Sequence, residues 1–143
     1  MATQNFANHA KFVPGFHVGV LGIFGINLVA SIVRLVRYFN LDNAISVLTA
    51  VGLVLAALFG RLFALTVQDR VIRLEMRLRM ERLLPPELRG RIGEFSVSQL
   101  VALRFAGDGE LAELARKVLE DKIEDRKAIK QMVRDWQADW LRA

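Results

Sequence analysis

The chain has 143 residues, with 20 Lys and Arg against 15 Asp and Glu, so its formal net charge is +5. Apolar residues make up 53% of it, which is too many for a disordered chain and unusual beside 24% charged residues, unless the two kinds are segregated. Because there is no cysteine, disulfide frameworks, Cys-based zinc or iron–sulfur sites and thiol catalysis are excluded. With two histidines, His9 and His17, a multi-His metal site is nearly excluded as well.

Two long runs, residues 15–33 and 43–60, carry no charged side chain. Each has about the length that a helix rising ~1.5 Å per residue needs to cross a hydrocarbon core of ~30 Å. Aromatic residues lie near the ends of both runs, as at a membrane interface: Phe12, Phe16, Tyr38, Phe39, Phe59 and Phe63. Core helices of a soluble bundle rarely reach this length without a charge, and a cleavable signal peptide would leave the second run unexplained.

The short link between the runs predicts a transmembrane hairpin over residues 15–60, with spans of about 15–37 and 42–63. Both termini then lie on one side of the membrane. Lys11 and the arginines from Arg61 onward outnumber Arg34 and Arg37 at the tip. The positive-inside rule therefore predicts cytoplasmic termini, with residues 1–14 as a cytosolic segment and the bacterial inner membrane as the location.

Small residues recur at helical spacing on both predicted spans and favour close packing of backbones in lipid. They are Gly15, Gly19, Gly22 and Gly25 on the first span, and Gly52, Ala56 and Gly60 on the second. The two stripes can face each other within one chain. Alternatively, one of them forms a homo-oligomer or binds a larger membrane protein.

His17 lies near the cytoplasmic end of the first span. An ionisable residue in a span raises the hypothesis of a haem or chlorophyll-type ligand or a proton relay. The alternative is an interfacial histidine hydrated by headgroups and water.

Residues 61–84 contain no Gly or Pro and are rich in helix formers, so the second span is predicted to continue as an amphipathic juxtamembrane helix. Two apolar stripes follow its length: Val67, Val71, Leu74 and Leu78, and Leu65, Ile72, Met76 and Leu83. Opposite charges four residues apart, such as Asp69 with Arg73, are spaced to pair along it. Its apolar surface needs a cover, which can be the C-terminal region, a partner or the membrane surface.

Residues 85–143 are predicted to form three or four short helices that pack a small core on the long helix. Pro85 breaks the long helix and Pro86 can begin the next. Ser96 and Gln99 form a capping-box pattern for a helix through Phe105, and Asp108 is a candidate N-cap for a helix from about residue 110. A last helix is expected from the helical spacing of its apolar residues, Ile129, Met132 or Val133, Trp136 and Trp140.

No catalytic motif is present: there is no nucleophile elbow, P-loop, dinucleotide fingerprint or zinc-protease pattern. Trp136 and Trp140, with Arg104, are candidate core or partner anchors, and nucleic-acid binding is not expected. Arg61, Asp69, Arg70 and Arg73 would lie at the membrane–cytosol junction. There they could bind lipid phosphates or order the C-terminal helices.

The whole net charge belongs to residues 1–84, which hold nine Lys and Arg against four Asp and Glu, while residues 85–143 are neutral overall. The basic excess therefore faces the membrane rather than a nucleic acid.

Three stretches are distinctive: QNFANHAKFVP at residues 4–14, RLFALTVQDRVIRLEMRLR at 61–79 and SQLVALRFA at 98–106. With the pattern around Lys127, Ile129, Lys130 and Trp136, they resemble a family of short bacterial membrane proteins of unknown function. The resemblance covers nearly the whole chain. It implies two spans followed by a cytosolic helical region, and it supplies no activity, substrate or catalytic residue.

The sequence thus predicts an all-α membrane protein without cofactor or metal. The leading hypothesis is a non-enzymatic accessory or scaffold subunit that docks through its spans and holds a protein partner with its cytosolic helices. One alternative is a homo-oligomeric assembly with a lipid-sensing or transport role. Another is a pigment- or haem-binding subunit that uses His17.

Overall fold

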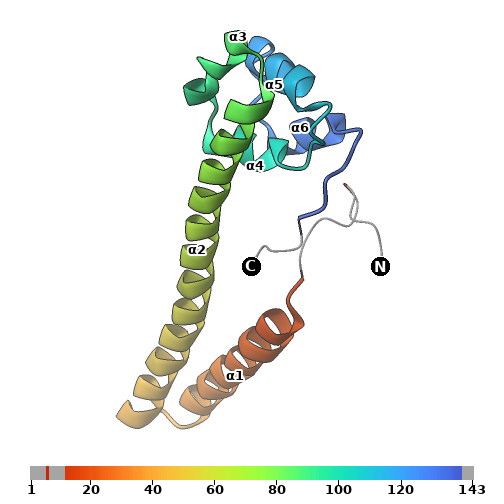
Figure 1. The fold of residues 1–143 in the computed structure, drawn as a ribbon. Coiled ribbons are helices and arrows are strands. Elements are labelled where there is room, and N and C mark those ends of the chain that lie inside the picture. The colour runs from red at the N-terminus through yellow and green to blue at the C-terminus, as the bar shows by residue number, and fades with distance from the viewer. Residues whose placement is uncertain (1–5, 7–11, 140–143) are drawn as a thin grey trace. The chain divides into compact units, whose positions relative to one another are not determined.

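The computed structural model describes residues 6 and 12–139, and within them the regular elements are helices, joined by turns and irregular segments, with one isolated β-bridge between Ala106 and Trp136. The elements, in chain order (Figure 1), are a π-helical segment η1 (Gly15–Val20), α1 (Leu21–Arg37), α2 (Leu41–Leu83), α3 (Pro86–Arg89), a 3-10 helix η2 (Ile92–Glu94), α4 (Val97–Leu103), α5 (Leu111–Glu120) and α6 (Arg126–Met132). The all-helical fold is the one the sequence predicts. The chain divides into two compact units, Phe12–Leu65 and a second that contains Thr66 and the residues after it.

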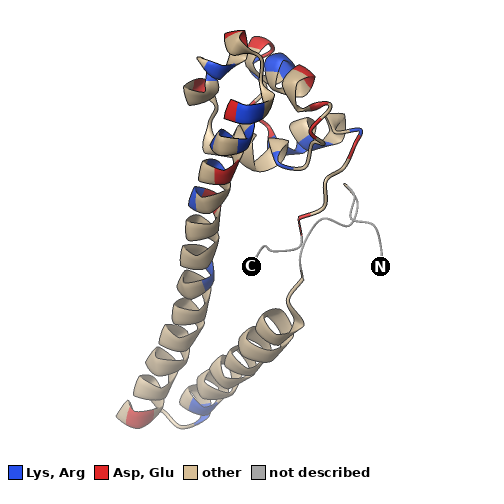
Figure 2. Ribbon diagram, viewed as in Figure 1, with Lys and Arg blue, Asp and Glu red and all other residues tan. Residues whose placement is uncertain are grey.

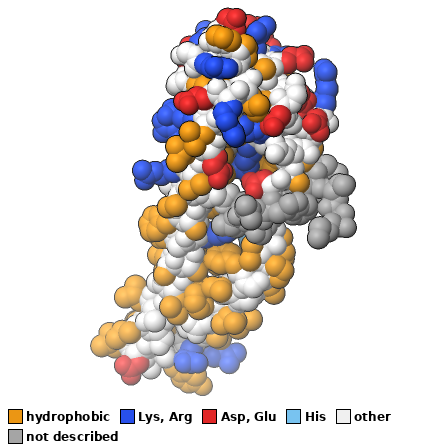
Figure 3. Space-filling model, viewed as in Figure 1, with side chains coloured by type: hydrophobic (Ala, Val, Ile, Leu, Met, Phe, Trp, Pro, Cys, Tyr) orange, Lys and Arg blue, Asp and Glu red, His pale blue; other side chains and the backbone are white. Residues whose placement is uncertain are grey.

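The first unit consists of η1, α1 and the first half of α2. Its two helical stretches, Gly15–Arg37 and the apolar part of α2, are each long and apolar enough to cross a membrane. Only 6% of the apolar window in each is buried within the structure. Hydrophobic side chains accordingly cover the surface of this unit in the view of Figure 3.

Residues 38–40 connect α1 to α2, and the connection ends in a helix cap. The Asn43 N–H donates to the Asn40 Oδ1 at 2.8 Å, and the Asn43 side-chain amide donates to the Tyr38 carbonyl at 2.6 Å. An asparagine at this position satisfies one of the N–H groups that the first turn of a helix leaves unpaired. The polar connection thereby starts α2 immediately after α1 ends.

The helix α2 runs without interruption over 43 residues, as the sequence predicts. Most charged residues of α2 lie in the half that follows Arg61 (Figure 2). The earlier half of this one helix therefore suits an apolar environment and the later half suits water. It ends at Leu83 because Pro85 cannot continue it, and the extended Pro85 leads into α3 with Pro86 in the first turn.

The second unit packs its short helices against one side of α2, which confirms the predicted small core. Three residues of α2 lie in that core, Ile72, Met76 and Met80, together with Leu84 just after the helix. They meet apolar residues of the later elements, among them Leu100, Val101, Leu111, Val118 and Ile129, all buried. The helix α4 contacts both α5 and α6.

The predicted capping box at the start of α4 is confirmed. The Gln99 N–H donates to the Ser96 hydroxyl at 3.2 Å, and the Ser96 N–H donates to the Gln99 side-chain oxygen at 2.8 Å. The helix ends at Leu103, two residues before the predicted Phe105. The predicted N-cap role of Asp108 is wrong, because α5 begins at Leu111 with Glu110 before it.

The end of α5 is closed by a left-handed residue. Lys122 has φ 51°, and the Ile123 N–H donates to the Val118 carbonyl at 3.0 Å while the Lys122 N–H donates to the Leu119 carbonyl. This pair of bonds is a Schellman motif, in which glycine is the usual left-handed residue. It reverses the chain toward α6, whose N-cap Asp125 accepts bonds from the N–H groups of Lys127 and Ala128.

Candidate interaction surfaces

An arginine of α2 holds the loop between α4 and α5. The Arg79 guanidinium donates to the Asp108 carboxylate at 2.6 and 2.8 Å and to the Ala106 carbonyl at 2.6 Å, with a longer bond of 3.3 Å to the Arg104 carbonyl. Its side chain is only 14% exposed, whereas that of Asp108 is 66% exposed. Spacing alone suggests that Arg79 pairs with Glu75. In the fold, Arg79 instead donates to one carboxylate and two backbone carbonyl groups of the loop.

After α6 the chain is extended and returns to the segment between α4 and α5. The Gly107 N–H donates to the Asp135 carbonyl at 2.8 Å, and the Gln137 N–H donates to the Phe105 carbonyl at 2.7 Å. The Glu110 carboxylate accepts from the Arg134 and Asp135 N–H groups. The predicted last helix is therefore wrong for residues 133–139, because backbone groups of this segment bond to residues 105–110 instead.

The predicted anchors Arg104 and Trp136 meet on one aromatic ring. Trp136 stacks on Phe105 with ring centroids 4.6 Å apart, and the Arg104 guanidinium lies 4.5 Å from the same centroid. The Arg104 Nε lies 3.1 Å from the Asp139 carboxylate, and its side chain is 9% exposed. Phe105 is fully buried, so these contacts fix the returning segment, residues 133–139, to the bundle. Trp140 lies outside the described residues.

The four residues predicted at the junction do not form one cluster. Asp69 pairs with Arg126 at 3.4 Å, and the Arg126 Nε donates to the Ser98 hydroxyl at 2.9 Å. Asp69 thus holds the start of α6 and does not pair with Arg73 as spacing alone suggests. Arg70 and Arg73 are exposed on α2.

Arg61 belongs to the first unit, where its guanidinium lies 5.7 Å from the centroid of the Phe16 ring.

His17 lies in η1 between two phenyl rings. Its ring stacks with Phe12 at 4.8 Å and meets Phe16 edge-on at 5.2 Å, and its Nδ1 lies 2.9 Å from the Val13 carbonyl oxygen. One ring nitrogen is thus engaged by the backbone within one helical turn. Among the described residues no group of three or more His, Cys, Asp or Glu could hold a metal ion. Ligation of a haem or pigment by His17 stays a prediction.

The small-residue stripes present open surfaces. A Cβ placed on any of Gly15, Gly19, Gly22, Gly25, Gly52 or Gly60 meets nothing within 4 Å, and Ala56 is exposed. The buried positions of the first unit are also small residues, Ser31 and Ala50. Pairing of the two stripes stays a prediction.

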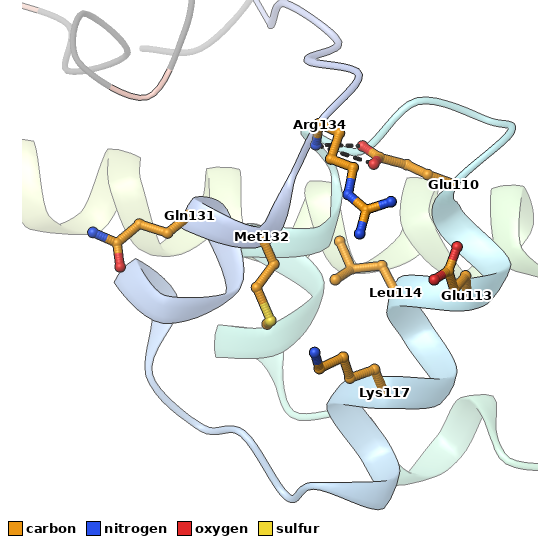
Figure 4. Close-up of a pocket in the computed structure, with 7 residues that line it drawn as sticks. All are labelled: Glu110, Glu113, Leu114, Lys117, Gln131, Met132 and Arg134. Carbon is orange, nitrogen blue, oxygen red and sulfur yellow. Dashed lines mark hydrogen bonds between the residues drawn. The ribbon is translucent and has the colours of Figure 1, made fainter.

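A shallow hollow lies between α5 and the end of α6, with a volume of about 240 Å³ (Figure 4). Its floor is apolar and its rim carries charges of both signs, from the residues Glu110, Glu113, Leu114, Lys117, Gln131, Met132 and Arg134. Pockets for small molecules measure ~300–1,000 Å³, so this hollow suits a side chain better than a cofactor.

A larger hollow of about 500 Å³ runs along α2 and the returning segment, lined by Ile72, Glu75, Met76, Arg79, Arg104, Gln137, Ala138 and Asp139. Its two guanidinium groups face carboxylates of the same unit, Asp108 and Asp139. Compensated charges of this kind hold a structure together and leave little net field for a bound ion.

Sequence reasoning missed Arg79. Its position in the sequence could have identified it. Arg79 lies three residues after Met76 and one before Met80, so it is next to the side of α2 that the short helices cover. A buried arginine needs acceptors, so a basic residue at the edge of a core stripe predicts a loop whose carbonyl groups face it.

No curated protein and no solved structure shows significant similarity to this chain. The sequence profile of one family, described as a family of unknown function (DUF6526), matches residues 1–143. This agrees with the resemblance to an uncharacterised family seen in the sequence. The chain belongs to DUF6526.

Proposed function

We propose that this protein is a non-enzymatic accessory or scaffold subunit of the bacterial inner membrane. It is anchored by Gly15–Arg37 and the apolar part of α2, and it holds a protein partner with the helical unit after Thr66. The observation that carries the proposal is the exposure of the two apolar stretches, because only 6% of the apolar window in each is buried. The core helix of a soluble protein would be mostly buried, and exposed apolar surfaces of this extent call for lipid or another protein.

Two antiparallel spans and cytoplasmic termini are part of this proposal. The contact of Arg61 with the Phe16 ring supports the antiparallel arrangement, because it joins the start of the first helical stretch to the end of the apolar part of α2. Basic residues after Arg61 support the cytoplasmic side.

The natural absence of cysteine makes the topology testable with single cysteines at the exposed positions Asn40 and Gln131. An impermeant maleimide should label Asn40→Cys in intact cells and Gln131→Cys only after permeabilisation. Equal labelling of both in intact cells would refute this topology.

The hollow between α5 and α6 is the proposed docking point for a partner side chain. An apolar floor formed by Leu114 and Met132 within a charged rim is the usual anatomy of an anchor pocket at a protein interface. The overall neutrality of residues 85–143 also fits a region that packs against protein.

A photo-crosslinking amino acid at Lys117, on the rim, tests this docking point, and the adjacent exposed Arg116, which is not among the lining residues, is the matched control. We expect a discrete adduct in membranes from position 117 and not from 116. Adducts from both positions in equal yield, or from neither, would contradict a docked partner in this hollow.

A homo-oligomeric assembly is the second candidate function, with a lipid-sensing or transport role. The observation that favours it is an apolar stripe on α2 that the second unit leaves exposed.

A further inference from the structure

One side of α2 remains apolar and exposed after the second unit has packed. The short helices cover Ile72 and Met76 of one stripe, which are 5% and 3% exposed. The other stripe consists of Val67, Val71, Leu74 and Leu78, whose side chains are 59%, 49%, 61% and 54% exposed. We call these four residues the α2 seam. The C-terminal region therefore covers the middle of one apolar stripe and leaves the seam without a cover in the described part of the chain.

Lipid cannot cover the whole seam if α2 spans the membrane as proposed above. At 1.5 Å per residue, Leu74 lies roughly 20 Å and Leu78 roughly 25 Å beyond Arg61 along the helix. The headgroup layer extends only about 5–8 Å beyond the hydrocarbon core on each side. These two leucines thus project into the cytosol, where burying apolar side chains against another protein surface lowers the free energy.

The spacing of the seam is that of a coiled coil. Its steps of four, three and four residues are those of alternating d and a positions, with Val67 at d. In a membrane, every copy of the chain has the same orientation and depth, so two copies bring the same stripe to the same height in parallel. A second copy of the chain is therefore the partner whose surface matches in both shape and register.

The charges beside the seam complement each other in that arrangement. Arg70 occupies a g position and Glu75 the following e position, and in a parallel pair each g residue lies next to the partner's e residue. The two-fold axis makes this pair of opposite charges twice. Glu81 occupies the next d position, so the apolar contact ends at Leu78.

The same spacing continues backward in the sequence to Ala64 and Gly60. A Cβ at Gly60 would meet nothing within 4 Å, so a second backbone can come close there. Small residues suit helix contacts in lipid, where there is no hydrophobic gain, and Val and Leu suit contacts in water, where there is. Along α2 the residues with this spacing change from small ones, Gly60 and Ala64, to the larger Val and Leu residues of the seam. This is the order expected for a helix contact that begins in lipid and continues into water.

We propose that the α2 seam binds the same seam of a second copy, forming a parallel two-helix contact that makes the membrane-anchored protein a homodimer. The cytosolic seam is shorter than two heptads and would be marginal in dilute solution. Confinement to a membrane raises the effective concentration of the two copies and favours the contact. This inference rests on the proposed membrane anchoring.

Single-cysteine crosslinking of the full chain in native membranes tests the proposal. Leu74→Cys lies on the seam, and its exposed neighbour Arg73→Cys lies off it and is the matched control. Under mild oxidation we expect disulfide-linked dimer from position 74 in at least fivefold greater yield than from 73. Equal yields at the two positions, no product from either, or a product from position 74 whose mass shows a different protein would overturn the homodimer.

Charge reversal gives a second readout that keeps the fold intact, because both residues are exposed. In the Leu74→Cys background, Glu75→Arg should reduce the dimer yield severalfold, and Arg70→Glu added to it should restore the yield. Failure of the double variant to restore it would overturn the predicted register.

Carbonate extraction of the same membranes separates the two proposals. A chain that is extracted into the soluble fraction refutes the anchoring. A chain that stays in the membrane without a seam crosslink refutes only the dimer.

Discussion

Replacement of Arg79 by methionine should destabilise the second unit far more than the same replacement at Arg73. Methionine replaces the apolar stem of the arginine side chain but removes every donor. The buried Ala106 carbonyl then loses its 2.6 Å bond, and the half-buried Arg104 carbonyl loses its 3.3 Å bond. Arg73 is exposed on the same helix, two turns earlier, and the change there alters charge without uncovering a buried group.

The magnitude follows from the partners. A bond to a charged donor contributes about 1.5–3 kcal/mol, and a buried acceptor left unsatisfied costs about 1–3 kcal/mol. The pair with Asp108 adds little, because that carboxylate is 66% exposed and screened by water. We therefore expect a loss of about 3 kcal/mol for Arg79→Met and less than about 0.5 kcal/mol for Arg73→Met. In a unit of this size, 3 kcal/mol lowers the Tm by roughly 15 °C.

The assay is equilibrium unfolding in urea of the full chain in mild detergent, followed by tryptophan fluorescence. Trp136 reports the bundle because it stacks on Phe105. A Trp140→Phe background removes the second of the two tryptophans. Asp108→Asn separates the contributions and should cost under about 1 kcal/mol. Equal midpoints for Arg79→Met and Arg73→Met, or a loss from Asp108→Asn as large as that from Arg79→Met, would refute the reasoning.

Three further changes probe local geometry by the same measurement. Gly107→Ala should cost about 1–3 kcal/mol, because its Cβ would overlap the Asp135 side chain, while Gly109→Ala meets nothing within 4 Å and should be near neutral; equal effects would contradict the close approach. Lys122→Gly should stabilise the unit by up to about 1 kcal/mol, since glycine adopts the left-handed φ of 51° at no steric cost, and a loss of stability would count against the Schellman closure. Asp125→Ala should cost about 1 kcal/mol as the loss of an N-cap, whereas Asp121→Ala at the C-terminus of α5 should be neutral or slightly stabilising, and the reverse order would show that capping does not govern these ends.

Local rules predicted the elements whose ends are decided by neighbouring residues. Pro85 and Pro86 end one helix and begin the next, and Ser96 with Gln99 starts α4, all within a few residues of sequence. The uncharged runs gave the apolar helices for the same reason, because helix length and apolar content are both visible in sequence. Periodicity showed two apolar stripes on α2 but could not tell which of them the C-terminal helices would cover.

Tertiary contacts decided the rest. Trp136 has helical spacing from Ile129, yet its segment is extended because residues 105–110 offer backbone and carboxylate partners from 24 to 32 residues away. Asp108 resembles an N-cap, but Arg79 of α2 takes its carboxylate. Both outcomes depend on which segments meet in space, and a window of neighbouring residues holds no information about that.

The late return of the chain to residues 105–107 has a consequence for synthesis. The core side of α2 has been made once Leu84 is added, but its cover needs Ile129 of α6 and the later segment in which Gln137 bonds to Phe105. At about 5–20 residues per second, roughly 3–11 s pass between the emergence of these two parts from the ribosome. During that interval the nascent chain shows both apolar sides of α2 at once, so chaperone capture and premature association should concentrate in this window rather than in the finished protein.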